Sequence, residues 1–303
     1  LIKGPGIIVG RKGTIGSIRW SDINYWPIDT AYYIKLKGTE IDLKWLSNKL
    51  LALGLSKLNM ATGTPGLNRD LVYKTNISIP SLPEQKKIAE ILSTVDRAIE
   101  KIDESIIETE KLKKGLMHEL LTKGVGHKEF KETEIGKIPK EWKVVKISDI
   151  ANVKGGKRLP KGHSLVSNKT SYPYIRIIDF KDMSVKTENL QYLLPETQKV
   201  IKQYTISYND VYISIAGSLG LVGSIPIELD GANLTENAAK LCNFKEVDKK
   251  YLVYIFNSYL VAKQIYSFAG KAQQPKLALF RIKKMKIPLP PIPEQNKIAE
   301  TLS

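Results

Sequence analysis

The sequence is poor in cysteine and histidine. Cys242 is the only cysteine among 303 residues, and the three histidines, His118, His127 and His163, lie far apart. One cysteine cannot form a disulfide framework, and these four residues do not have the ligand spacing of a zinc site. Low cysteine content without a disulfide pattern is typical of reducing compartments, so we expect a cytoplasmic protein.

Sequence signatures of catalysis are also missing. The chain contains no Walker phosphate loop, no HExxH helix motif and no GxSxG elbow, and Gly10, Gly13 and Gly16 do not form a dinucleotide fingerprint. The densest acidic run, 103–110, lies in a helical pattern, where a solvated face explains it more simply than a Mg²⁺ site. We therefore expect no catalytic residues and no metal in this chain.

Long hydrophobic runs are absent as well. The longest uncharged stretch, Val211–Ile227, is interrupted by glycines, serines and a proline. It predicts a strand, a tight turn and a second strand instead of a membrane span. No signal peptide is visible. Because the chain opens on Leu1 within an apolar and glycine pattern and stops at Ser303 as a helical pattern begins, we interpret it as a fragment.

Basic residues exceed acidic residues by a wide margin. Lys and Arg number 47 and Asp and Glu 31, giving a net charge of +16 and a sequence pI near 9.6. Such an excess favours a polyanionic partner, either nucleic acid or an anionic membrane surface. A generally basic proteome is the alternative explanation.

One segment occurs twice. The sequence 77–93, ISIPSLPEQKKIAEILS, returns at 287–303 as IPLPPIPEQNKIAETLS, 210 residues later. Upstream, Gly10–Ile18 aligns with Gly217–Ile225, and Gly63–Leu67 aligns with Gln273–Leu277. A repeat of this size is much longer than a solenoid unit, so it predicts two similar globular modules.

The first copy of the repeat opens a long helical pattern. A proline at the helix start is followed by apolar residues at alternating spacings of four and three, which is typical of a coiled-coil seam. We expect a helix over 83–124, of roughly 60 Å at 1.5 Å per residue. The predicted packing residues are Ile88, Leu92, Val95, Ile99, Ile102, Ile106, Leu116 and Leu120.

An apolar stripe of this length requires a second helix. The repeat that begins at Pro293 is one candidate and would pack antiparallel if the modules lie at opposite ends; an intermolecular coiled coil is the other. Residues 83–124 contain eight basic and nine acidic residues, a net charge of −1, which leaves +17 for the rest of the chain. The helix is therefore predicted to be a spacer, and the modules to bind the polyanion.

The second module contains the clearest basic segment. Residues 154–178 include six basic residues and no acidic residue, and the loop KGGKRLPKGH at 154–163 combines them with glycine and proline. Loop glycines let backbone amides approach phosphate, lysines neutralise it, and Arg158 is suited to guanine O6 and N7. A solvated basic loop is the competing interpretation.

Further polar clusters carry amide, hydroxyl and basic groups suited to base edges, although turn and cap chemistry explains them equally well. Tyr172, Tyr174 and Tyr192 could stack on bases, but packing on a sheet is the more common role. The full set of predicted DNA-contacting residues is Lys154, Lys157, Arg158, Lys161, Arg176, Asn233, Thr235, Asn237, Lys271, Gln273, Gln274, Lys276, Arg11, Lys12, Thr62, Thr64, Asn68 and Arg69.

These motifs, in this order, resemble the specificity subunits of type I restriction-modification systems. The resemblance rests on the duplicated IPxLPEQxKIAExLS segment, on IGKIPKEWKVVKISDI at 135–150, on GKRLPKG followed by PYIRIIDF, and on AGSLGLVGSI with NLTENAAKL. It covers nearly the whole chain. It implies an α+β fold in which two similar mixed α/β target recognition domains are joined by long helices that form a coiled coil.

The resemblance also implies a function. Each recognition domain would read one half of a bipartite, gapped site in double-stranded DNA, and the antiparallel helices would fix the spacing. Methyltransferase subunits, which hold S-adenosylmethionine, would dock on this framework, and restriction subunits would add ATP- and Mg-dependent cleavage; this chain would hold no cofactor and would not contact a membrane. Carried over, the expected parts are the end of the first recognition domain (1–82), the central helix (83–124), a linker (125–134), the second recognition domain (135–292) and the start of the distal helix (293–303).

Other functions remain open from the residues alone. A stand-alone DNA-binding regulator would bind specific sites without a methyltransferase partner, and an RNA-binding protein would prefer single-stranded or A-form substrates. A coiled-coil scaffold would bind nucleic acid weakly and lose it at moderate salt.

Overall fold

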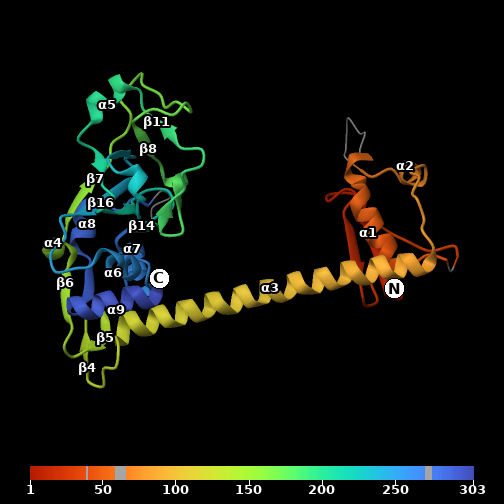
Figure 1. Ribbon diagram of the computed structural model, residues 1–303, viewed down its shortest axis with the longest axis horizontal. Helices are drawn as coiled ribbons and strands as arrows, with labels where there is room; N and C mark the ends of the chain where they lie inside the picture. The colour runs from red at the N-terminus through yellow and green to blue at the C-terminus, as the bar shows by residue number, and fades with distance from the viewer. Residues whose placement is uncertain (39, 59–65, 270–274) are drawn as a thin grey trace. The chain divides into compact units, whose positions relative to one another are not determined.

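A computed structural model describes residues 1–38, 40–58, 66–269 and 275–303. The chain divides into two compact units, Leu1–Glu108 and Thr109–Ser303, and the division falls inside the long helix α3, Leu82–Lys123 (Figure 1). The expected mixed α/β architecture with a long central helix is confirmed. The boundaries assigned to the recognition domains remain predictions.

The first unit, Leu1–Glu108, contains a small antiparallel sheet covered by helices. Its strands have the order β2-β1-β3, with β1 at Gly6–Gly10, β2 at Ile18–Ser21 and β3 at Ala31–Tyr33. The helices are α1 at Leu43–Leu53, the 3₁₀ turn η1 at Leu55–Leu58, α2 at Arg69–Tyr73 and the first part of α3. Ile7 and Val9 on β1 pack with Trp45 and Leu50 of α1 and with Ala89 of α3, so one core holds the sheet and both helices.

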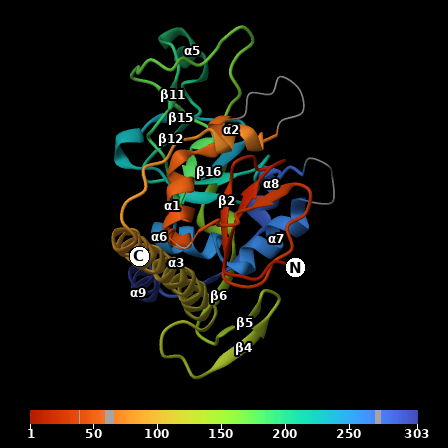
Figure 2. The same cartoon turned by 90° about the vertical axis from the view of Figure 1, so that its right-hand side faces the viewer.

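The second unit, Thr109–Ser303, contains two four-stranded sheets. One is antiparallel, β14-β13-β16-β7, and the other is mixed, β11-β8-β15-β12, with β15 parallel to β8. The strands are β7 (Asn152–Gly155), β8 (Pro173–Ile175), β11 (Gln191–Tyr192), β12 (Thr205–Ile206), β13 (Val211–Ser214), β14 (Val222–Ser224), β15 (Ala232–Leu234) and β16 (Ala238–Cys242). Figures 1 and 2 both place the antiparallel sheet between the mixed sheet and the helices α6, α7 and α9.

The remaining elements of the second unit surround these sheets. Strand β13, buried along its whole length, shares a core with α6 and α9, which accounts for its run of apolar residues. The helical elements are α4 (Ile147–Ile150), η2 (Ile177–Asp179), α5 (Pro195–Ile201), η3 (Ile227–Leu229), α6 (Lys249–Phe256), α7 (Tyr259–Ala269), α8 (Leu279–Lys284) and α9 (Ile292–Leu302). The two-stranded sheets are β4 (Phe130–Thr133) with β5 (Gly136–Pro139), β6 (Lys143–Lys146) with β17 (Lys286–Leu289), and β9 (Phe180–Lys181) with β10 (Ser184–Val185).

The structure tests two local predictions directly. The uncharged stretch that begins at Val211 forms β13, a turn and β14, paired antiparallel with Val211 opposite Ser224, as predicted. The segment 125–134, expected to be a linker, instead contains β4, which pairs with β5. Its mixed charges suggested a solvated connection, but Phe130 and Ile138 supply the apolar residues of a hairpin.

The two units repeat the same glycine turn, but not in the predicted alignment. Gly13 and Gly16 adopt φ of 74° and 69°, and Gly217 and Gly220 adopt 71° and 77°. In each turn the second glycine donates its N–H to the residue three before the first, Gly10 or Ser214. Gly13 therefore corresponds to Gly217, whereas the predicted alignment had paired Gly10 with Gly217. Positive φ favours glycine, so these turn positions mark the true register.

A buried glutamine anchors each copy of the PEQ motif. Gln85 is 1% exposed; its Nε2 donates to the carbonyls of Glu40 and Pro80 at 3.0 Å, and its Oε1 accepts the N–H of Asp42 at 2.8 Å. Gln295 is fully buried and makes the same three bonds, to the residues Glu246, Pro290 and Asp248. Asp42 and Asp248 in turn cap α1 and α6 by accepting the N–H of Trp45 and of Tyr251, each at 2.8 Å. We call the one N–H and two carbonyls that bind each glutamine the helix socket. The sequence repeat therefore corresponds to a structural repeat of this socket.

The end of α3 is fixed within the second unit by Gly124 and Glu294. Gly124 has φ of 66°, and a Cβ there would lie 2.6 Å from the Trp142 ring and 2.4 Å from Glu294 Oε1, so only glycine fits. Glu294, in the first turn of α9, accepts the N–H of Val125 at 3.0 Å. The start of α9 thus lies at the end of α3, and Leu121 shares a buried cluster with Ile298 and Leu302.

This placement bears on the predicted helix pair. Figure 1 draws α9 beside the last turns of α3 with the opposite chain direction. Over these few turns, the packing is antiparallel. Among the helices that the structure describes, none is long and apolar enough to cross a membrane.

Candidate nucleic-acid interface

The basic loop of the second unit begins on a backbone contact that requires glycine. Beyond β7, Gly156 N donates to Ala238 O at 3.0 Å and Lys157 N donates to Leu234 O at 2.8 Å. A Cβ on Gly156 would lie 2.0 Å from Thr235 O and 2.4 Å from Leu234 O, so any other side chain would force the two segments apart. The loop 156–158 is therefore held against the segment 234–238. We call this pair of segments the loop platform.

Tyr174 binds the loop platform through a hydrogen bond to the backbone of Lys157. This side chain of β8 is only 3% exposed, and its hydroxyl donates to Lys157 O at 2.9 Å. Burial raises the pKa of Tyr174, so the hydroxyl keeps the proton that it donates. Tyr192 packs on one core cluster and Tyr172 on another, both half-buried. The sheet-packing role weighed for these three tyrosines fits their burial.

Arg158 projects from the loop platform and pairs with Glu236. Its Nε donates to Glu236 Oε1 at 2.8 Å, while the Arg158 side chain is 80% exposed and that of Glu236 26% exposed. The hydrogen bond from Arg158 and the charge of Glu236 raise the pKa of the guanidinium. Partial burial acts to raise the pKa of Glu236, but hydrogen bonds from Arg158, its own backbone and Thr235 hold that pKa below its ordinary value. Both groups are charged at neutral pH.

Three other predicted lysines lie within four residues of Arg158 in the sequence. Lys154 on β7, Lys157 and Lys161 are exposed, and Lys157 Nζ lies 5.3 Å from the centre of the Tyr204 ring. Lys276, also exposed, lines a cavity of about 400 Å³ together with Gly156 and Glu236. The loop platform and Lys276, which are far apart in the sequence, are therefore brought together at one place.

Two predicted contact residues are buried and serve the fold. Asn233 is 1% exposed, and its Nδ2 donates to Ile201 O at 2.8 Å. Thr235 is 5% exposed, and its Oγ1 donates to Glu236 Oε2 at 3.0 Å. A buried amide that satisfies a main-chain carbonyl does not reach a base edge. The burial of Asn233 and Thr235 counts against direct DNA contact in the conformation described, and their assignment to such contact stays a prediction.

Two more predicted residues are engaged within the unit. Arg176 forms a two-pronged ion pair with the buried Asp179, with Nε to Oδ2 at 3.1 Å and NH2 to Oδ1 at 3.0 Å. That pairing fixes the turn η2, so Arg176 is a structural residue here. The carbonyl of Asn237, within the loop platform, accepts the N–H of Ile215 at 2.8 Å, and the residue is half-buried.

The first unit also brings two predicted clusters together. Leu67 N donates to Arg11 O at 2.9 Å, which places Asn68 and Arg69 next to the turn that carries Arg11 and Lys12. Arg11 NH1 donates to Asp29 O at 3.1 Å, and Lys12 is exposed. Asn68 caps α2 by accepting the N–H of Asp70 at 2.8 Å, so its side chain is a helix cap, one of the two roles considered. Thr62, Thr64, Lys271, Gln273 and Gln274 lie outside the described residues.

The predicted seam of α3 is exposed over most of its length. Leu92, Val95, Ile99, Ile102, Ile106 and Leu116 are between 38% and 58% exposed. Ile88 packs on the core of the first unit, and Leu120 on that of the second. Their role in helix pairing remains a prediction.

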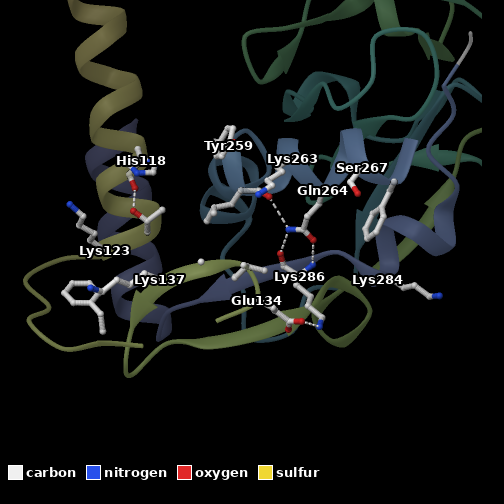
Figure 3. Close-up of a pocket in the computed structure, with 16 residues that line it drawn as sticks. His118, Lys123, Glu134, Lys137, Tyr259, Lys263, Gln264, Ser267, Lys284 and Lys286 are labelled. Carbon is white, nitrogen blue, oxygen red and sulfur yellow. Dashed lines mark hydrogen bonds and ion pairs between the residues drawn. The ribbon is translucent and has the colours of Figure 1, made fainter. Parts of the chain in front are cut away.

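A lysine-lined cavity of about 980 Å³ lies elsewhere on the second unit, and sequence reasoning missed it (Figure 3). Its walls come from the end of α3, the β4–β5 hairpin, α7 and the segment 284–286. Gln264 bonds the backbone of Lys286, and Lys286 Nζ pairs with Glu134 at 2.5 Å. The lysines that line it are Lys123, Lys137, Lys263, Lys284 and Lys286. They come from four separate segments, so no local pattern could have indicated them.

Sequence reasoning also missed Glu236 as the partner of Arg158, because 78 residues separate them. Within the described ranges, no group of three or more His, Cys, Asp or Glu side chains could hold a metal ion.

Comparison with known proteins places this geometry in a family. The family profile of the type I restriction modification DNA specificity domain matches residues 1–110 and 139–303. The MjaVIII type I restriction enzyme specificity subunit of Methanocaldococcus jannaschii is 29% identical over 98% of this chain and 68% of its own length. The putative MjaX specificity subunit of the same organism is 32% identical, over 80% of this chain and only 55% of its own length.

A solved structure from a type I R-M system, described in terms of complex assembly and conformational transition, matches the fold. Its TM-score is 0.66 at 18% identity, covering 99% of this chain and 74% of that one. At such identity the likeness supports the fold alone, and the family profile, which matches most of the chain, supports the assignment. The chain belongs to the family of type I restriction-modification DNA specificity domains.

Proposed function

We propose that this chain is a DNA-recognition subunit of a type I restriction-modification complex. The loop platform would face a DNA duplex, with Arg158 reading a base and Lys154, Lys157 and Lys161 contacting phosphates. The observation that carries the proposal is the exposed Arg158 guanidinium, held on a rigid backbone support within a basic surface, in a chain of this family. Such division of labour is common, because phosphate contacts fix register while base contacts give specificity.

The first unit would read a second half-site. Its turn with Arg11 and Lys12 has the same glycine geometry as the turn at Gly217 in the second unit, and Arg69 lies close to it. Two related readers suit a bipartite site, and α3 would set the number of base pairs between the halves. The chemistry of methylation and cleavage would belong to other subunits.

The exposed seam of α3 would be covered by a partner helix. Apolar side chains from Leu92 to Ile106 are about half exposed along one helix, and a stripe at this spacing is stable only when another helix covers it. Support for an antiparallel partner comes from α9, which already packs in that direction on the last turns of α3. Methyltransferase subunits would dock on the resulting framework.

Selection from a randomised duplex library tests the proposal. The chain of residues 1–303 is incubated with the library at two salt concentrations, and bound sequences are read. We expect a short enriched motif that survives the higher salt, because base contacts release fewer counterions than phosphate contacts. Binding without enrichment, with affinity falling steeply in salt, would overturn the proposal in favour of a scaffold role. A preference for single-stranded RNA competitor would overturn it in favour of RNA binding.

A further inference from the structure

We propose that Glu236 determines the base preference of the second unit by orienting Arg158 for guanine. This inference rests on the proposed function. It makes Glu236 a positioning residue that touches no base and acts only through the guanidinium of Arg158. The family assignment itself does not point to any such carboxylate.

The hydrogen-bond geometry leaves the reading edge of Arg158 free. A guanidinium carries five N–H donors in a planar fork. Glu236 accepts the one on Nε at 2.8 Å, from the side of the fork. Among the described residues, the four N–H groups on the two terminal nitrogens have no hydrogen-bond partner, and the side chain is 80% exposed. Two parallel donors of this kind match guanine O6 and N7 in the major groove.

Glu236 is itself restrained. Its second oxygen, Oε2, accepts the hydroxyl of the buried Thr235 at 3.0 Å. The Thr235 N–H donates to Ile175 O at 3.1 Å, which fixes this residue to β8. Because both carboxylate oxygens are engaged, Glu236 cannot turn freely, and the plane of the Arg158 guanidinium is set by a chain of bonds that begins in the core.

The main chain fixes the distance between the two residues. Lys157 N bonds Leu234 O, and Gly156 allows the segments 156–158 and 234–238 to approach closely. Tyr174, buried in β8, holds Lys157 O. Arg158 and Glu236 each follow directly on a bonded residue, so their separation does not depend on loop motion.

Stability does not explain the pair. Arg158 is 80% exposed, and an ion pair in that setting contributes little to folding. A carboxylate on a surface that binds phosphate also repels the ligand. Residues 154–178 contain no acidic residue, and Glu236 is the acid that folding brings beside the basic loop. Orientation of Arg158 accounts for an acid at this place, where charge alone would disfavour it.

The test compares two substitutions of one residue in the chain of residues 1–303. Glu236→Ala removes both the charge and the acceptor, whereas Glu236→Gln removes the charge and keeps an acceptor oxygen for Nε. Affinities are measured on the selected duplex, on the duplex with one guanine replaced, and on an unrelated duplex. Glu228→Ala, an exposed carboxylate outside the loop platform, is the matched control, and thermal unfolding verifies that each variant is folded.

We expect Glu236→Ala to lose about tenfold in preference for one guanine, within the range for a two-donor contact. Glu236→Gln should keep most of that preference. Both should bind the unrelated duplex at least as tightly as the parent chain. In an Arg158→Ala background, Glu236→Ala should cause no further loss.

Equal effects of Ala and Gln on preference would mean that Glu236 acts by charge alone, and would overturn the inference. An unchanged preference in Glu236→Ala, when Arg158→Ala does lose the guanine, would also overturn it while leaving the proposed function intact. If the parent chain selects no motif, the proposed function fails and this inference fails with it.

Discussion

Glu294 and Trp142, 152 residues apart, meet in a hydrogen bond of 2.9 Å from the indole Nε1 to Oε2. The other oxygen of Glu294 accepts the N–H of Val125 at 3.0 Å and lies 2.8 Å from His127 Nε2. A carboxylate only accepts, so Nε2 carries the proton in that contact. One partly buried carboxylate, 14% exposed, thereby joins the end of α3, the segment after β5 and the start of α9.

Replacing Trp142, which donates a hydrogen bond to Glu294, tests this contact between α3, α9 and the segment after β5. Trp142→Phe keeps an aromatic ring in the core but removes the indole N–H, which leaves a charged acceptor short of one bond. We expect the free energy of unfolding of the second unit to fall by about 2 kcal/mol. Chemical denaturation followed by circular dichroism measures it. Trp26→Phe, at a side chain that is 73% exposed, is the control and should change little; equal effects of the two substitutions would contradict the role given to Glu294.

The helix socket makes a second prediction. Gln295→Ala would leave the N–H of Asp248 and the carbonyls of Glu246 and Pro290 without their partner. Each unpaired buried group costs on the order of 1–3 kcal/mol, so we expect a loss of at least about 2 kcal/mol in the second unit. Asn296→Ala, its exposed neighbour, should be neutral. A loss no larger than that of Asn296→Ala in the same denaturation experiment would count against the socket.

Lys161 separates phosphate contact from base contact. It is exposed in the basic loop, and a lysine that neutralises one phosphate acts on every sequence alike. We expect Lys161→Ala to weaken all duplexes by a similar factor and to reduce the slope of log affinity against log salt by about 1. Titrations of the selected and an unrelated duplex at several salt concentrations measure both effects. Loss confined to the selected duplex would show that Lys161 reads a base; Lys297→Ala on α9 is the control.

The length of α3 should set the gap of the recognised site. Deleting residues 100–106 removes two turns, about 10 Å, and keeps the seven-residue register of the seam. We expect library selection to recover the same half-sites with a gap shorter by about three base pairs. An insertion of seven residues at the same place should lengthen the gap. If both variants select the parent gap, α3 is not the spacer.

Cys242 provides a pH-dependent prediction. Burial raises the pKa of its thiol, with a further contribution from the Asp210 carboxylate, while Lys240 and Lys154 act in the opposite direction. The neutral thiol is thus favoured in the folded chain. Its contribution to stability is complete below the pKa of the unfolded thiol and is lost as pH rises through the folded value.

We therefore expect iodoacetamide to alkylate Cys242 in the native chain roughly tenfold or more slowly than in the denatured chain at pH 8. The stability difference between the parent chain and Cys242→Ala should shrink as pH rises from 8 to 10. Native alkylation as fast as in denaturant would contradict the raised pKa.

Periodic features could be predicted from the sequence, and contacts between distant residues could not. Helix α3 was visible because its apolar residues repeat over many turns, and the turn after β13 because glycine positions limit the backbone. The PEQ repeat was visible too, but the sequence did not indicate that its glutamine is a buried anchor. The predicted glycine alignment was wrong by three residues. Residue identity alone does not show which glycines have positive φ, and only those glycines occupy equivalent turn positions.

The candidate site shows the same limit. The basic loop is local and was found, whereas its partner Glu236 is not local to it. Asn233 and Arg158 are both polar residues near turns, and only burial separates an amide that bonds Ile201 O from a guanidinium that is 80% exposed. Burial follows from the packing of β15 between β8 and β12, which is a property of the whole sheet.

The socket around each PEQ glutamine consists of main-chain atoms. Gln85 and Gln295 each bond one N–H and two carbonyls, and no side chain of the surrounding module takes part in these three bonds. Carbonyls are present in all twenty residue types and the N–H in all except proline. The attachment of each helix to its module through the glutamine therefore depends little on which side chains the module carries. The residues of the DNA-binding surface can change, or the module can be replaced, without loss of these bonds.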